Sequence, residues 1–144
     1  MSTVKQLLDE KGRRIYSVHP DATVFEALQM MAEKNVGGLL VVEGEKLLGI
    51  FSERDYARKV ALKDRSSKEM RVSELMTKEI VCVNSDTTIE ECMALMNERY
   101  IRHLPVVDDG KLVGIVTIRD IVHKIITTQK FTIRELEKYI YGTM

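Results

Sequence analysis

Two short stretches of the chain carry a hydroxyl residue, an arginine and an aspartate at the same spacing. They read Gly49-Ile-Phe-Ser-Glu-Arg-Asp55 and Gly114-Ile-Val-Thr-Ile-Arg-Asp120, and each continues an apolar run that is typical of a strand. A hydroxyl and free N–H groups at a helix start, with a cation nearby, favour a phosphate, and a carboxylate suits a ribose diol. Ser/Thr-x-x-Asp by itself is more often a helix cap. The glycine and the arginine, present in both stretches, favour a nucleotide site.

The two stretches belong to an internal repeat with an offset of 65 residues. Aligning residues 15–60 with residues 80–125 needs no gap, and 17 of the 46 pairs are identical. The pattern predicts strands over 15–18, 39–42, 47–51, 80–83, 104–107 and 112–116, and helices over 24–34, 52–62, 89–100 and 118–127. Because a helix connects the first two strands of each copy, we expect these strands to be parallel, and the next two to form a hairpin.

The predicted fold class is α/β (α+β), with two pseudo-symmetric β-α-β-β-α repeats packed into one module. The predicted parts are a lead-in helix (1–14), the first repeat (15–65), a linker (66–78), the second repeat (79–128) and a C-terminal helix (129–144). The tail over 132–141 is amphipathic, so we expect it to pack against the body or against a second subunit.

Composition narrows the class of function. The formal net charge is zero and charged residues make up 31% of the chain, so the basic surface that nucleic acids need is not indicated. No apolar run reaches the ~18–20 residues that span a bilayer, and no signal peptide is predicted at the N-terminus. Cys82 and Cys92 lack metal-ligand or CxxC spacing. These features predict a cytoplasmic protein that binds neither a metal, a membrane nor nucleic acid.

The full pattern resembles a known family. The paired motifs, the helix starts Thr23-x-x-Glu26 and Thr88-x-x-Glu91, and the strands Leu39–Val42 and His103-Leu-Pro-Val-Val107 are similar to those of a tandem pair of cystathionine-β-synthase (CBS) domains, the Bateman module. The resemblance covers residues 15–128 and is that of free-standing bacterial members. It implies a pseudo-symmetric disc with two clefts for adenosine-containing ligands: AMP, ADP, ATP, NAD(H) or S-adenosylmethionine. It also implies a homodimer.

The resemblance assigns a role to each candidate residue. The aspartates that would hold the ribose are Asp55 and Asp120. The residues expected on the phosphate side are Ser52, Thr117, Arg54, Arg119, Arg102, His103 and Arg58. The alternative is that Arg102 and Arg58 are solvated and that His103 packs at a strand end. Those expected to form the adenine-binding wall are Ile15, Tyr16, Gly37, Gly38, Leu39, Ile80, Val81, Leu104 and Pro105.

The two copies differ just before their central strands. The first has Gly37-Gly38, where the second has Arg102-His103. An arginine and a histidine suit the phosphate of a mononucleotide, whereas the glycines would leave room for a bulkier dinucleotide or for a close approach of backbone. We therefore expect two non-equivalent clefts, without assigning a ligand to either. An aspartate also disfavours a 2′-phosphate, so NAD(H) should bind better than NADP(H).

No catalytic constellation is visible. The chain has no Ser/His/Asp set, no HExxH and no Walker Gly-x4-Gly-Lys-Ser/Thr sequence. The leading hypothesis is a non-catalytic sensor that binds an adenine nucleotide and reports energy or redox state to an unidentified partner protein. The alternatives are a dimeric structural adaptor with vestigial clefts and, less favoured, a nucleotide-consuming enzyme.

Overall fold

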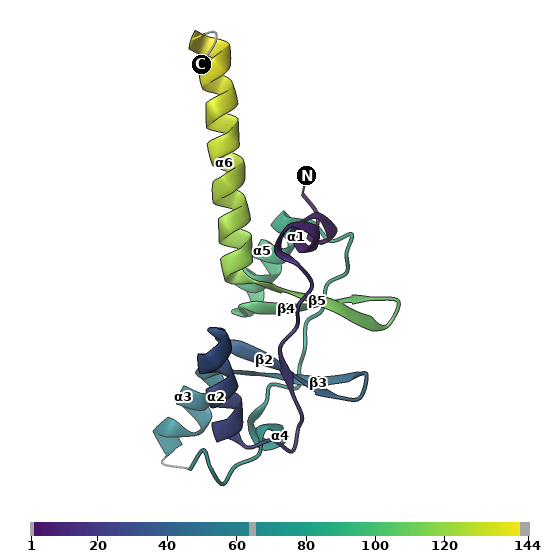
Figure 1. Cartoon of the computed structure of the whole chain (residues 1–144), viewed down its shortest axis with the longest axis vertical. Coiled ribbons are helices and arrows are strands. Elements are labelled where there is room, and N and C mark those ends of the chain that lie inside the picture. The colour runs from purple at the N-terminus through teal and green to yellow at the C-terminus, as the bar shows by residue number, and fades with distance from the viewer. Residues whose placement is uncertain (1, 64–65, 142–144) are drawn as a thin grey trace.

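The computed structural model describes residues 2–63 and 66–141 (Figure 1). The first half contains the helices α1 (Val4–Lys11), α2 (Val24–Lys34) and α3 (Glu53–Lys59), a 3-10 turn at Ala61–Lys63, and the strands β1 (Ser17–Val18), β2 (Gly38–Glu43) and β3 (Lys46–Ser52). The second half contains the helices α4 (Val72–Leu75), α5 (Ile89–Arg99) and α6 (Ile118–Tyr141), and the strands β4 (His103–Asp108) and β5 (Lys111–Thr117). The predicted mixed α/β class is confirmed, and the order helix, strand, strand, helix occurs in both repeats.

Local sequence signals explain where the helices begin and end. Thr23 and Glu26 form a reciprocal capping box at the start of α2, and Thr88 and Glu91 form the same box at the start of α5. Helix α2 ends at Asn35 in the left-handed conformation (φ 55°), a residue type that tolerates it. Helix α3 is shorter than predicted: it ends at Lys59, and a 3-10 turn follows at Ala61–Lys63.

The first repeat has the predicted sheet. Strand β1 pairs in parallel with β2, and β2 pairs antiparallel with β3. In the second repeat β4 and β5 form the hairpin, but the strand predicted over 80–83 is reduced to one parallel bridge between Val83 and Val106. In the first repeat the Leu40 N–H donates to the Tyr16 carbonyl. The equivalent of Leu40 is Pro105, which has no N–H, so this rung cannot form.

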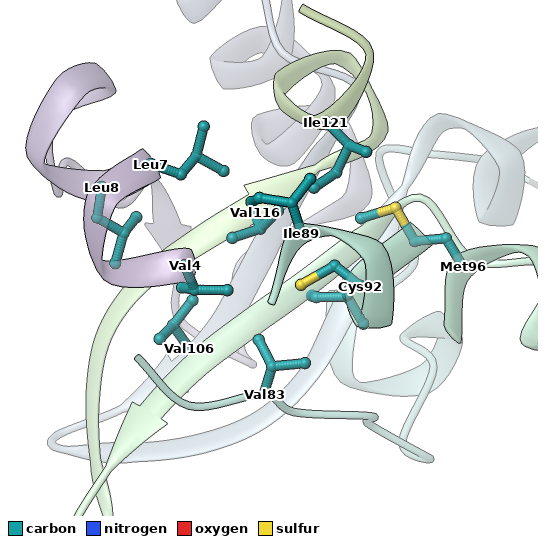
Figure 2. Close-up of a cluster of buried hydrophobic side chains, with 11 residues drawn as sticks. Val4, Leu7, Leu8, Val83, Ile89, Cys92, Met96, Val106, Val116 and Ile121 are labelled. Carbon is teal, nitrogen blue, oxygen red and sulfur yellow. The ribbon is translucent and has the colours of Figure 1, made fainter. Parts of the chain in front are cut away.

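The segment before each repeat packs on the other repeat. One core combines α1 with the second repeat, and Figure 2 shows Val4, Leu7 and Leu8 lying over Val106 and Val116. The chain entering α1 also hydrogen-bonds there, since the N–H of Val4 donates to Thr87 and the N–H of Ile89 donates to Ser2. The exchange ties the two halves together, because neither core is complete without a segment from the other half.

The other core is built in the same way. It combines Val72 and Leu75 of α4 and the preceding Met70 with the first repeat. Backbone bonds fix this segment, since the N–H of Val24 donates to Met70 and the N–H of Val72 donates to Ala22. Within residues 66–78, which the sequence predicts as the linker between the repeats, Met70, Val72 and Leu75 are buried.

The C-terminal region is one helix where the sequence predicted two. Helix α6 runs without a break from Ile118 to Tyr141 and projects from the body (Figure 1). Its outer half does not pack back on the body, because Ile133, Leu136 and Ile140 are more than half exposed. Of the two expected arrangements, packing on the body is not observed for this half of the helix, and packing on a second subunit stays a prediction. Within the part of the chain that the structure describes, no helix is long and apolar enough to cross a membrane.

Candidate functional site

The Asp55 carboxylate lies at the third position of α3 and is buried (9% exposed). It accepts hydrogen bonds from Ser52 N (3.0 Å), Ser52 Oγ (3.1 Å) and Thr77 Oγ1 (3.1 Å), and Lys59 Nζ lies 3.2 Å away. These donors hold the carboxylate in a position where water is largely excluded. A ribose that binds Asp55 must replace or share the Thr77 and Lys59 contacts.

Asp120 occupies the matching position of α6 but has a different neighbour. It accepts from Thr117 N at 2.9 Å and forms an ion pair with Lys11 Nζ at 2.5 Å. The Lys11 ammonium also donates to the Ile115 carbonyl at 2.9 Å. Lys11 is a site residue that the sequence did not predict, because it comes from the end of α1, outside both motifs. The repeat offset places Met76 in the equivalent position of the first half, so this cation belongs to one cleft only.

The helix N-termini are partly used by the fold itself. The Glu53 N–H donates to the Gly37 carbonyl, and the Ile118 N–H donates to the Arg102 carbonyl. The hydroxyls of Ser52 and Thr117 accept from the third N–H of their own helices. Two of the N–H groups expected for a phosphate in each cleft are therefore already bonded.

His103 packs on Gly38 across the boundary between the repeats. A Cβ atom on Gly38 would lie 3.0 Å from His103 Cε1 and Nε2, so any other residue there would press on the ring. In this conformation the space beside Gly38, predicted for a larger ligand or a close approach of backbone, is taken by the ring of the equivalent residue in the other repeat. Gly37 remains open, since a Cβ atom there would meet no other atom within 4 Å.

The charge state of His103 follows from this position. Burial, and next the Arg102 charge, lower the pKa of the imidazole below its ordinary value, while Asp120 and Asp55 act in the opposite direction. The charges of Asp55, Asp120 and Lys11 therefore all reach the His103 ring, although burial is the largest influence on its pKa.

Three of the predicted arginines line a groove that contains neither aspartate. Arg54, Arg58 and Arg102 line a groove of about 880 Å³ together with Tyr100 and Ile118, whereas neither aspartate lines it. Arg54 Nη1 donates to the Tyr100 carbonyl at the end of α5, at 2.8 Å. The structure thus brings three of the four predicted arginines together. Arg119 does not line this groove.

The predicted adenine wall divides into two groups. Ile15, Tyr16, Ile80 and Val81 are half-buried and keep surface that a ligand can contact. The central-strand residues are wholly inside, so the prediction that they line the cleft is not met in this conformation: Leu39, Leu104 and Pro105. Strand alternation could not reveal this, because a strand covered on both faces reads as one apolar run. Among the described residues, no group of three or more His, Cys, Asp or Glu side chains could hold a metal ion.

Two repeats of this kind, each ending a hairpin in a capped helix with an aspartate at its third position, define a CBS domain pair. The chain belongs to the CBS domain family, whose model matches residues 4–62 and 72–127.

The relatives agree with this assignment. The chain is 39% identical over 150 residues to the CBS domain-containing protein CBSX3, mitochondrial, of Arabidopsis thaliana, an alignment that covers 98% of this chain and 73% of that protein. A putative signal-transduction protein with CBS domains from Burkholderia ambifaria has a solved structure that superposes with a TM-score of 0.86 at 50% identity, covering 89% of this chain and 96% of that one. The CBS domain pair of protein MJ0100, solved in complex with 5-methylthioadenosine and S-adenosyl-L-methionine, superposes with a TM-score of 0.77 at 27% identity, covering 89% and 98%.

Proposed function

We propose that this protein is a non-catalytic regulatory module that binds adenosine-containing ligands in two unequal clefts and reports their concentration to a partner protein. AMP is the foremost ligand, and NAD(H) and ATP are the next candidates. The observation that carries the proposal is the pair of aspartates at matching helix positions, each at the start of a helix that directly follows a strand. The complex of the MJ0100 domain pair with two adenosine compounds supports the choice of ligand class.

The two clefts would differ in the element that supplies the cation. Beside Asp120, the Lys11 ammonium comes from α1 and provides a cation for a phosphate. Beside Asp55, Lys59 of the same helix, α3, provides the cation, and the Thr77 hydroxyl also holds the carboxylate. The two clefts are therefore unequal in their contacts, while each has one lysine beside its aspartate.

Signalling would follow from displaced contacts. A ribose at Asp120 competes with Lys11 at the end of α1, and a ribose at Asp55 competes with Thr77 beyond the end of α4. Since α1 and α4 each complete the core of the opposite repeat, both competitions act on segments that join the two halves. A ligand changes the conformational equilibrium only as far as it binds the two states with different affinity.

The test is calorimetric titration of AMP, ATP, NAD⁺, NADH, NADP⁺ and S-adenosylmethionine into the wild type, Asp55→Asn and Asp120→Asn. Asparagine keeps the side-chain shape and one acceptor oxygen, and a thermal melt of each variant checks that it is folded. Two sites, each lost with its own aspartate, are expected, and NAD(H) should bind more tightly than NADP(H). Absence of binding by every ligand to a folded, nucleotide-free protein would refute the proposal.

A second candidate function is a dimeric structural adaptor whose clefts are vestigial. The observation that favours it is the exposed outer half of α6, which offers an apolar surface far from either aspartate. Loss of the partner protein on shortening α6, with no ligand detected by titration, would favour the adaptor over the sensor.

A further inference from the structure

Helix α6 carries an exposed apolar strip with a heptad spacing. Numbered from Val122 in alternating steps of four and three residues, the strip gives d positions at Val122, Gln129 and Leu136 and a positions at Ile126, Ile133 and Ile140. The five apolar members are between 46% exposed (Ile126) and 67% exposed (Ile140). The strip is therefore left without a partner inside the described chain.

We propose that α6 pairs with α6 of a second copy of this chain as a parallel, in-register, two-stranded coiled coil. Isoleucine fills every a position and leucine fills the d position at Leu136, which is the pairing of residue types that favours two parallel strands. Val122 and Gln129 occupy the other two d positions. The proposal specifies the interface of the expected homodimer. It does not depend on nucleotide binding.

Gln129 distinguishes parallel from antiparallel pairing. In a parallel pair, residues at the same d position face one another, so the two Gln129 amides can hydrogen-bond across the seam. In the antiparallel pair that overlaps all six positions, Gln129 faces Ile133 of the other copy, since 129 + 133 equals 126 + 136. That arrangement leaves a buried amide against a methyl group without a hydrogen-bond partner, which is unfavourable.

The charged residues beside the strip also favour parallel pairing. Lys130 directly follows a d position, and in the same antiparallel register it would lie close to Lys130 of the other copy. In the parallel register the flanking pairs are Ile125 with Lys130 and Thr132 with Glu137, and neither opposes like charges. The parallel pair thus avoids both a polar mismatch in the seam and a repulsion beside it.

The size of the strip requires the body to take part. Five side chains, each about half exposed, would bury roughly 1,000 Å² in a helix pair, which is less than the ~1,200 Å² of the smaller stable interfaces. A parallel pair brings both bodies to the same end of the helices, whereas an antiparallel pair separates them by about the ~36 Å length of α6. Beside the base of α6, Met93 and Tyr100 are exposed and line the groove that Ile118 also lines. These residues supply the additional apolar area in the parallel arrangement.

Disulfide trapping tests the orientation. In a Cys82→Ser background, Ile140→Cys should form a disulfide-linked dimer on mild oxidation, because a positions of the same number face each other in a parallel pair. Lys138→Cys, two residues away on the outer face of the pair, is the matched control and should stay monomeric on denaturing gels. In the antiparallel register Ile140 lies opposite Val122, so only Val122→Cys/Ile140→Cys would be linked. Linkage of that double variant without linkage of Ile140→Cys alone would overturn the proposal.

Sedimentation equilibrium tests whether the strip drives dimer formation. The double variant Ile133→Glu/Leu136→Glu should raise the dimer dissociation constant at least tenfold, and Lys138→Glu, on the outer face, should leave it within twofold. A monomeric wild type, or a dimer that Ile133→Glu/Leu136→Glu does not weaken, would overturn the proposal. The same variant should bind nucleotide as the wild type does, so failure of the coiled coil and failure of the ligand proposal give different results.

Discussion

The exchange of α1 onto the second repeat predicts that Leu8 and Gly114 are energetically coupled. Leu8 is fully buried, and Leu8→Ala should lower the free energy of unfolding by about 2–5 kcal/mol through lost burial and a residual cavity. A Cβ atom on Gly114 would lie 2.9 Å from both Leu8 methyl groups, so Gly114→Ala alone should cost about 1–3 kcal/mol by overpacking. In the double variant the leucine methyls are gone and the new Cβ fills part of their space. The double variant should therefore lose about 1–2 kcal/mol less than the sum of the two single losses.

The assay is urea unfolding of the four proteins, followed by circular dichroism. Gly49→Ala provides the matched control, because it is the repeat equivalent of Gly114 and its Cβ would meet the Thr77 carbonyl and the Met76 sulfur, each at 2.8 Å. Leu8→Ala cannot relieve those contacts, so its effect should add to that of Gly49→Ala within about 0.5 kcal/mol. Additive losses for Leu8→Ala and Gly114→Ala would show that α1 does not lie on β5 in solution, and the interleaved arrangement would be rejected.

Buried and bonded groups lead to three further predictions. Burial lowers the pKa of His103 below its ordinary 6.5, so at low pH the unfolded chain binds more protons than the folded protein. The free energy of unfolding should therefore fall as the pH drops below about 6.5. His103→Gln should make this fall less steep in denaturation curves measured at several pH values, and an unchanged slope would contradict the prediction. Burial raises the pKa of Cys92 to about 11, whereas Cys82 is exposed, so Ellman's reagent should modify Cys82 first. Rapid reaction of both thiols in the folded protein would contradict this prediction. Thr77→Val should lower the free energy of unfolding in urea by about 1 kcal/mol, because it removes a hydrogen bond to the buried Asp55 carboxylate. An unchanged free energy of unfolding would mean that water replaces the hydroxyl.

Several features of this protein could be predicted from neighbouring residues alone. Thr23 and Glu26 are three residues apart, so their side chains cap a helix wherever the rest of the chain lies. The same holds for Ser52 with Asp55. The offset of 65 residues then carried each local prediction from one half to the other, including the hairpins and the matching positions of the two aspartates.

The repeat also led to errors where the two copies differ by one residue. Pro105 stands where the first copy has Leu40, and its missing N–H reduces a predicted strand to a single bridge. His103 is the repeat equivalent of Gly38, and the two residues contact each other: the ring of His103 lies against Gly38, where a side chain would press on it. A repeat predicts equivalent positions, but it does not say that two equivalent residues touch.

Most of the secondary structure and the two hairpins could thus be predicted from the sequence, because they depend on contacts within about four residues or within one hairpin. The residue types at both candidate clefts could be read from the two motifs. The tertiary structure alone decided that Lys11 neutralises Asp120, that the His103 ring covers Gly38, and that α1 completes the core of the second repeat. Lys11 and Asp120 are 109 positions apart, and no local pattern constrains such a pair. It forms because each repeat leaves part of its sheet uncovered, and burying that apolar surface draws in the helix that precedes the other repeat.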